Sequence, residues 1–223
     1  MKKALSILSI AAASLAAGGI AHAQSADTAN RWYLGGGLGH VNANPNSSDY
    51  ADQRAGAQTS TGRDNSTAWK AYGGYQFTSI WGAELGYAHL GQFQNSYSLP
   101  AQNGSGVGTG KLSAWSLAGT ATWPINQDFA LRGKLGLARL RTDYSFSGSG
   151  AGSGYASGDN GSATKTNLMF GLGAQYNLNR NVALRFDYEN FGKVGSPTNN
   201  LTTPGATGQA KPSMVSASVQ YLF

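Results

Sequence analysis

Residues 213–223 read Ser-Met-Val-Ser-Ala-Ser-Val-Gln-Tyr-Leu-Phe. Apolar side chains occupy every second position from Val215 onward, and Ser216, Ser218 and Gln220 alternate with them. Successive side chains of a β-strand point to opposite faces, so this segment has one apolar and one polar face. An apolar face that ends in two aromatic residues is typical of a strand in a membrane barrel, with lipid outside and a polar lumen inside.

Seven earlier segments alternate in the same way. Together with the last segment they predict an all-β fold, an eight-stranded antiparallel up-and-down transmembrane β-barrel. A soluble sandwich or lipocalin-like barrel would also alternate, but it would not carry its charges on the inner face, because isolated charges are costly in a dry core. The predicted strands span residues 31–41, 67–77, 81–90, 112–123, 128–141, 166–178, 182–191 and 213–223.

The predicted connections alternate between short turns and long loops rich in Gly, Ser, Asn, Gln and Thr. Short periplasmic turns and longer external loops are the expected asymmetry of a bacterial barrel. An even number of strands then places both termini on the periplasmic side. The four long extracellular loops are predicted at about residues 42–66, 91–111, 142–165 and 192–212.

The first 23 residues have the pattern of a secretory signal peptide. Lys2 and Lys3 precede an apolar run over residues 4–20, and Ala21-His22-Ala23 is a small-x-small cleavage site. A membrane anchor helix is the alternative, but the run contains Ser and Gly-Gly, and no stop-transfer charges follow it. We therefore expect a signal peptide over 1–23, a short periplasmic segment over 24–30 and the barrel over 31–223.

Composition excludes several classes of protein. The 223 residues contain no cysteine, so disulfides and cysteine-based metal sites are excluded, and no cofactor is expected. Without the predicted signal peptide, 14 Lys and Arg face 10 Asp and Glu, a net charge of +4. These basic residues are scattered, which does not predict nucleic-acid binding but is compatible with anionic lipid. The mean hydropathy is −0.30, and no later run approaches the roughly 20 apolar residues of a spanning helix.

Several segments resemble the OmpA-like transmembrane domain. The run Ala71-Tyr-Gly-Gly-Tyr-Gln-Phe, followed by Trp81-Gly-Ala-Glu-Leu-Gly-Tyr, is similar to its second and third strands. Arg31-Trp-Tyr-Leu-Gly resembles its first strand, and Ala183-Leu-Arg-Phe-Asp-Tyr its seventh. The resemblance covers essentially all of the chain after the predicted signal peptide except the long loops. It implies location in the cell outer membrane, and we expect the periplasmic peptidoglycan-binding domain that the family often adds to be absent.

Aromatic residues mark the predicted strand ends. A final Phe with Tyr two residues before it resembles the closing strand of bacterial outer-membrane barrels, which the assembly machinery reads, so Tyr221 and Phe223 are the predicted assembly signal. Amphipathic rings suit the boundary between lipid and water. The predicted girdle at the short turns consists of Trp32, Tyr75, Phe77, Trp81, Trp123, Phe129 and Tyr176.

Inward-facing charges are the candidate functional residues. In the OmpA-like family an inward Glu on strand three pairs with an inward Arg on strand seven and closes the lumen, and Glu84 and Arg185 stand at those places. Lys134 resembles the family's basic residue on strand five. Gln175 stands where the family has a Glu, so any switching of the Glu84–Arg185 pair to another pairing is expected to differ here. The predicted lumen charge cluster is Glu84, Arg185, Arg132, Lys134, Asp187 and Lys70.

Two readings of these charges remain open. They either fill and rigidify the core of a barrel with a structural or surface-interaction role, or they line a narrow, gated, porin-like channel for ions or small solutes. A lipid A-modifying enzyme is the third hypothesis, but it needs a His beside a Ser or an acid. After the predicted signal peptide only His40 and His89 remain, and neither lies in a His-x-Ser element, so no enzyme is expected. The expected partners are outer-membrane lipid and lipopolysaccharide, the barrel assembly machinery and surface ligands of the loops.

Overall fold

The computed structural model describes residues 29–42, 58–65, 67–99, 104–149, 160–193 and 211–223. The predicted signal peptide and residues 24–28 lie outside this part of the chain. No helix with the length and apolar character of a membrane span occurs among the described residues. The strands are β1 (Arg31–Asn42), β2 (Gln58–Asn65), β3 (Thr67–Gln76), β4 (Trp81–Leu99), β5 (Gly104–Pro124), β6 (Phe129–Ser149), β7 (Asn160–Asn177), β8 (Val182–Asn190) and β9 (Ser213–Leu222).

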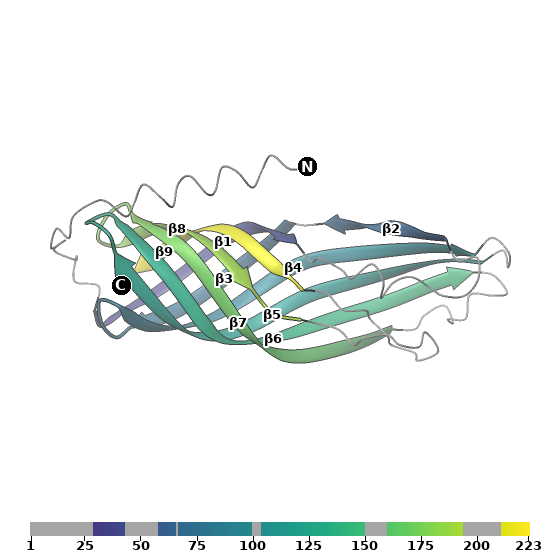
Figure 1. Cartoon of the computed structure of the whole chain (residues 1–223), viewed down its shortest axis with the longest axis horizontal. Coiled ribbons are helices and arrows are strands. Elements are labelled where there is room, and N and C mark those ends of the chain that lie inside the picture. Colours follow the sequence, from purple (N-terminus) through teal and green to yellow (C-terminus); the bar gives the residue numbers. More distant parts are fainter. Residues whose placement is uncertain (1–28, 43–57, 66, 100–103, 150–159, 194–210) are drawn as a thin grey trace.

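Eight of these strands close into a barrel (Figure 1). Each of β3 to β8 pairs antiparallel with the next strand, and β1 lies between β3 and β9. The ladder between β1 and β9 runs from Tyr33↔Leu222 to Asn42↔Ser213 and joins the two ends of the sheet. A closed wall pairs its backbone groups internally, as a lipid environment requires. The predicted eight-stranded antiparallel barrel is confirmed.

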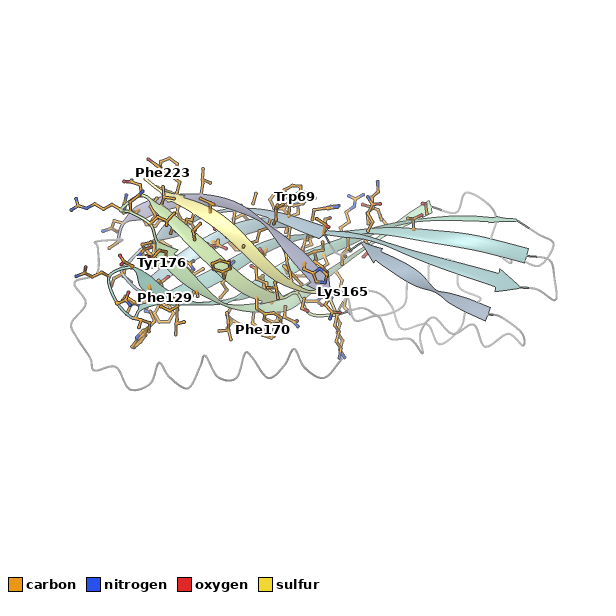
Figure 2. The ribbon with its side chains drawn as sticks, turned by 90° about the horizontal axis from the view of Figure 1, so that it is seen from above. Trp69, Phe129, Lys165, Phe170, Tyr176 and Phe223 are labelled. Atoms are coloured by element: carbon orange, nitrogen blue, oxygen red, sulfur yellow. The ribbon has the colours of Figure 1, made fainter. Side chains whose placement is uncertain are left out.

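The outer face of the barrel is apolar. Leu38, Leu135 and Leu168 are 67–73% exposed, although such side chains are usually buried in soluble proteins. Figure 2 shows side chains standing out from the wall along the length of the barrel. An unbroken apolar surface of this size needs lipid as its solvent.

Three short turns share one end of the barrel, which we call the turn end. Each turn is closed by the side chain of its second residue, which accepts a hydrogen bond from the first N–H of the next strand. Thr78 Oγ1 accepts from Trp81 N at 2.9 Å, Asn126 Oδ1 from Phe129 N at 2.7 Å and Asn179 Oδ1 from Val182 N at 2.8 Å. Thr and Asn form such local bonds readily, which is why these sequences turn within a few residues.

Four strands run further than the sequence predicted. β4 continues to Leu99 and β5 begins at Gly104, so most of the predicted loop 91–111 is a ladder. β6 and β7 likewise occupy both ends of the predicted loop 142–165, and β2 lies within the predicted loop 42–66. The loop predictions were wrong in these parts because they placed each strand end where the apolar alternation stops. The alternation stops where lipid contact ends, but backbone hydrogen bonds between the strands continue beyond that point.

The prolonged strands form an open sheet that we call the hairpin extension. It consists of β2 and the parts of β4, β5, β6 and β7 within residues 92–99, 104–111, 142–149 and 160–165. A β-bulge at residues 89–92, with Gly91 at φ 92°, marks the place where β4 leaves the barrel and begins to pair with β2. Figure 1 shows the extension projecting from the end of the barrel opposite the turns, which we call the hairpin end.

Candidate functional site

Seven buried charged side chains fill the middle of the lumen. Four are basic and three are acidic, so the group carries one excess positive charge. They come from β3, β4, β6 and β8, which face one another across the barrel. All six residues of the predicted cluster are among them, and Glu189 is the seventh. We call this group the lumen network, and its members are Lys70, Glu84, Arg132, Lys134, Arg185, Asp187 and Glu189.

Glu84 and Arg185 meet in the lumen. Arg185 Nη1 donates to Glu84 Oε2 at 2.9 Å, and the Arg185 side chain is completely buried. The same guanidinium donates to Gln220 Oε1 at 3.0 Å and lies 3.2 Å from Asp187. Glu84 also contacts Lys134 at 2.5 Å. The pair is therefore one link in a branched network of charge-assisted hydrogen bonds.

A second branch lies beside this pair. Lys70 Nζ donates to Asp187 and to Glu189, both at 2.8 Å. Lys134 Nζ donates to Glu189 Oε1 at 2.7 Å and so connects the two branches. Each carboxylate of the network has at least two basic partners, which offsets the cost of removing it from water.

Two tyrosines pack among the charges. The Tyr72 ring lies 4.2 Å from the Arg185 guanidinium carbon, and its hydroxyl is 3.0 Å from Ser218 Oγ. Tyr33 donates a hydrogen bond to Glu84 Oε2 at 3.1 Å. Gly35 makes room for the first ring, because a Cβ there would lie 2.3 Å from Tyr72 Cζ. Gly35, which belongs to the glycine run of β1, therefore allows the close packing of Tyr72 in the lumen.

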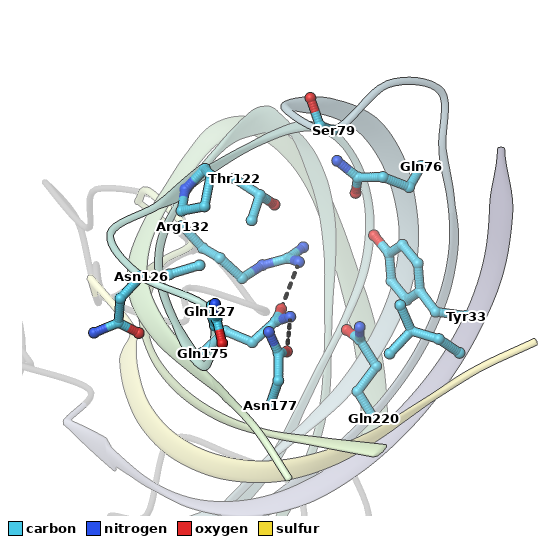
Figure 3. Close-up of a pocket in the computed structure, with 13 residues that line it drawn as sticks. Tyr33, Gln76, Ser79, Thr122, Asn126, Gln127, Arg132, Gln175, Asn177 and Gln220 are labelled. Carbon is cyan, nitrogen blue, oxygen red and sulfur yellow. Dashed lines mark hydrogen bonds between the residues drawn. The ribbon is translucent and has the colours of Figure 1, made fainter. Parts of the chain in front are cut away.

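Arg132 lies on the turn side of the network. Its Nη1 donates to Gln175 Oε1 at 3.1 Å, and Gln175 in turn donates to Asn177 at 2.8 Å (Figure 3). These residues line a cavity of about 40 Å³, which we call the turn-end cavity. A second cavity of about 10 Å³ lies beside Lys70, Lys134 and Glu189. The two cavities share no lining residue, so side chains separate them.

An apolar cluster fills the lumen at the hairpin end. The sequence analysis expected polar inner faces throughout, and that expectation was wrong for this part of the lumen. The two-residue alternation of burial continues in β3 to β7 here, but the inward side chains are apolar. We call this cluster the apolar plug, and its members are Val41, Ala68, Ala88, Leu90, Leu112, Ala114, Ala138, Leu140, Met169, Phe191 and Met214.

The sequence profile of the OmpA-like transmembrane domain matches residues 27–223. The chain belongs to this family. Outer membrane protein A of Yersinia pseudotuberculosis serotype I is 30% identical over 196 residues, which are 83% of this chain and 50% of that protein. Outer membrane protein A of Serratia marcescens is 27% identical over 223 residues, 100% of this chain and 56% of that protein. The chain thus spans about half the length of the curated relatives it matches.

A solved structure supports the same fold for this OmpA-like barrel. OprG, an outer membrane protein of Pseudomonas aeruginosa, matches with a TM-score of 0.51 and 15% identity over 90% of this chain and 99% of OprG. The family match makes the chain an outer-membrane barrel protein, and its lumen network lies inside the wall of that barrel.

The two histidines of the OmpA-like barrel lie away from the lumen network. His40 is exposed on the outer face of β1. His89 stacks on Trp69 with ring centroids 6.2 Å apart, within a group that includes Tyr87. Both histidines therefore belong to the outer face of the wall.

Several lumen residues escaped the sequence analysis. Tyr33 and Gln220 both contact the predicted pair, and Glu189 anchors two lysines, yet none was singled out as a site residue. Strand parity was the available signal. Tyr33 lies next to outward-facing Trp32, and Gln220 and Glu189 each lie an even number of positions from an inward residue of the same strand. Parity could not show which inward residues touch, because that depends on the stagger between strands.

Proposed function

We propose that this protein is a non-enzymatic outer-membrane barrel with a structural and surface-interaction role. It keeps its lumen closed and carries the hairpin extension on the outer surface of the cell. One observation carries the first part: the apolar plug and the lumen network lie in series along the same lumen. Ions crossing the barrel would have to pass both.

The closed lumen argues against the gated channel, which is the second candidate. A gate that only rearranges the ion pairs of the lumen network would leave the apolar plug in place. Its residues Leu140, Met169 and Met214 are almost completely buried. A dry apolar constriction opposes ions as strongly as a fixed ion pair does, because the ion must shed its water. Rigidifying the barrel is the role that this packing supports best.

The proposed orientation places the turn end in the periplasm. Short turns on that side and long connections outside are the usual arrangement of bacterial barrels. Residues 1–23 would then be a cleaved signal peptide, and 24–30 a periplasmic segment. The predicted girdle residues fit the inner boundary of the membrane, since Trp32 packs on Tyr75 at 4.9 Å and Tyr221 on Phe223 at 5.1 Å at this end.

The hairpin extension supports the surface-interaction role. It carries polar side chains, such as Asp143, which pairs with exposed Arg141 at 2.9 Å at its boundary with the barrel, and it lies beyond the apolar band of the barrel. Exposed Lys111 and Arg139 near its base suit the phosphate groups of lipopolysaccharide. Assembly by the barrel assembly machinery, through Tyr221 and Phe223, is part of the same proposal.

Single-channel recording in planar bilayers tests the closed lumen. We expect no unitary conductance from the folded chain, and none from Glu84→Gln, because the apolar plug remains. A wide porin added to the same bilayer is the positive control. Discrete openings of the wild-type chain would overturn the proposal in favour of the channel.

Cysteine labelling of intact cells tests the orientation. The natural chain contains no cysteine, so an introduced one is unique. We expect a membrane-impermeant maleimide to label Ser145→Cys in the hairpin extension but not Gln127→Cys at the turn end, both exposed positions. Both variants should react after the cells are lysed. If only Gln127→Cys were labelled on intact cells, the turn end would face outward and the proposed orientation would be wrong.

A further inference from the structure

Arg132 is the least satisfied charge of the lumen network. Its side chain is 2% exposed, yet among the described residues its Nε and Nη2 donate no hydrogen bond. Nη2 lies 3.5 Å from Glu84 Oε2, without hydrogen-bond geometry. That carboxylate is already engaged by Tyr33, Lys134 and Arg185. A guanidinium has five N–H donors and no acceptor, so Arg132 presents unused positive donors to its surroundings.

Two neighbouring side chains share this property. Gln76 Nε2 and Thr122 Oγ1 are buried and have no hydrogen-bond partner in the described part of the chain. Both line the turn-end cavity together with Arg132. In Figure 3 the Arg132 guanidinium reaches into this pocket between Thr122 on one side and Gln175 on the other. Groups from β3, β5 and β6 that can donate therefore surround one small space.

The charge of this region is also unbalanced. The lumen network has four basic and three acidic members, and its excess is one positive charge. Arg132 is the one charged residue among those that line the turn-end cavity, and no Asp or Glu lies in its wall. Water can occupy donors, but it does not neutralise a buried charge. An anion does both.

We propose that the turn-end cavity binds one small monovalent anion, with chloride as the physiological ligand. Arg132 Nε and Nη2, Gln76 Nε2 and the Thr122 hydroxyl supply the donors. A cavity needs about 10–15 Å³ to hold one water. The turn-end cavity, at about 40 Å³, therefore has room for a chloride and a water. It is too small for an organic anion such as gluconate. Ser79, Asn126 and Gln127 of the turns lie at its wall, so the ion enters from the turn end.

Replacement of chloride by gluconate tests the site. The chain is folded in detergent micelles, and urea unfolding is followed while sodium concentration and ionic strength stay constant. A site with a Kd of about 0.1 M raises the folded-to-unfolded ratio about tenfold between 0.01 and 1 M chloride. We expect this response from the wild-type chain.

A matched pair of variants separates the site from general salt effects. Arg132→Met removes the donors and the excess charge together. We expect the folded-to-unfolded ratio of this variant to stay the same when chloride replaces gluconate. Arg139→Met lies on the same strand but on the exposed outer face, and it should keep the wild-type response. Equal responses of wild type and Arg132→Met would overturn the proposal.

Bromide diffraction provides a test that needs no variant. Crystals of the wild-type chain grown in bromide should show an anomalous peak within hydrogen-bond distance of Arg132 Nε or Nη2. Bromide replaces chloride in such sites and is identified by its own scattering. A cavity that holds only water, with no anomalous signal, would show that the donors are hydrated and that no anion is bound. This result stands even where Arg132→Met does not fold.

Discussion

The lumen network converges on the carboxylate of Glu84. It accepts hydrogen bonds from Tyr33 and Arg185, and it contacts Lys134 at 2.5 Å. The network already has more basic than acidic members, so the loss of this one acid leaves four positive charges against two. At the residue scale, Glu84 therefore holds together groups that would otherwise repel.

Glu84→Gln should destabilise the folded barrel strongly. The change keeps the size of the side chain but leaves four buried cations with only two carboxylates, which costs about 3–5 kcal/mol. Urea unfolding in micelles measures the loss. Asp143→Asn is the control, since its ion pair with Arg141 is exposed and should contribute less than about 1 kcal/mol. Equal losses in the two variants would mean that the lumen charges are effectively in water.

Gly35→Ala should also destabilise the barrel. The added Cβ would lie 2.3 Å from Tyr72 Cζ, so the ring that stacks on Arg185 must move. Overpacking of this kind costs about 1–3 kcal/mol. Gly133→Ala is the matched control, because nothing lies within 4 Å of a Cβ there. If both variants unfold at the wild-type urea concentration, Tyr72 is not held in the position described.

At the scale of elements, β9 closes the barrel against β1. Beyond the last rung of the ladder, Phe223 N donates to Trp32 O at 2.9 Å, and Arg31 Nε donates to Phe223 O at 2.7 Å. The Phe223 ring itself is 60% exposed and packs on Tyr221. The backbone of Phe223 thus seals the wall, while its side chain is free to contact lipid or a partner.

Phe223→Ala distinguishes an assembly signal from a membrane anchor. We expect a drop in outer-membrane abundance and more periplasmic degradation, since the variant keeps its backbone bonds and loses only the ring. Trp123→Ala is the control, because Trp123 is 65% exposed at the same end of the barrel but belongs to β5. Immunoblots of fractionated membranes give the comparison. Similar losses in both variants would assign Phe223 to the girdle alone.

The whole molecule consists of a closed barrel and a hairpin extension held by different forces. The barrel wall is stabilised by lipid outside and by the packed lumen inside. The hairpin extension depends on its own ladders and meets no strand of β1, β8 or β9 in the described part of the chain. The barrel should therefore fold without it.

Removal of residues 93–110, which form the β4–β5 part of the hairpin extension, tests this division. A two-residue Asn-Gly turn can join Gln92 to Lys111, which are partners in the β4–β5 ladder. We expect the shortened chain to keep β-rich circular dichroism and the change in gel mobility on heating that folded membrane barrels show. Any surface binding by the extension should fall. Failure of the shortened chain to fold in micelles would show that the extension stabilises the barrel.

The sequence determined the barrel because lipid imposes a pattern on every strand. Trp32, Leu85 and Leu135 could be assigned outward, and Lys70, Glu84 and Arg185 inward, since each follows from the two-residue period alone. The likeness of Lys70–Gly91 to two strands of the OmpA-like domain then supplied the expected pairing. These are local signals, and they remain readable without any coordinates.

The tertiary structure alone decided which inward residues touch and how far the strands extend. Lys134 reaches both Glu84 and Glu189, and Arg132 is left facing a cavity, because strand stagger sets their relative heights. Leu140 and Met214 form a plug only because seven of the barrel strands bring apolar residues to the same part of the lumen. Beyond the membrane, Gly- and Ser-rich strands continue through backbone hydrogen bonds, which are almost independent of side chains and therefore leave no pattern in the sequence.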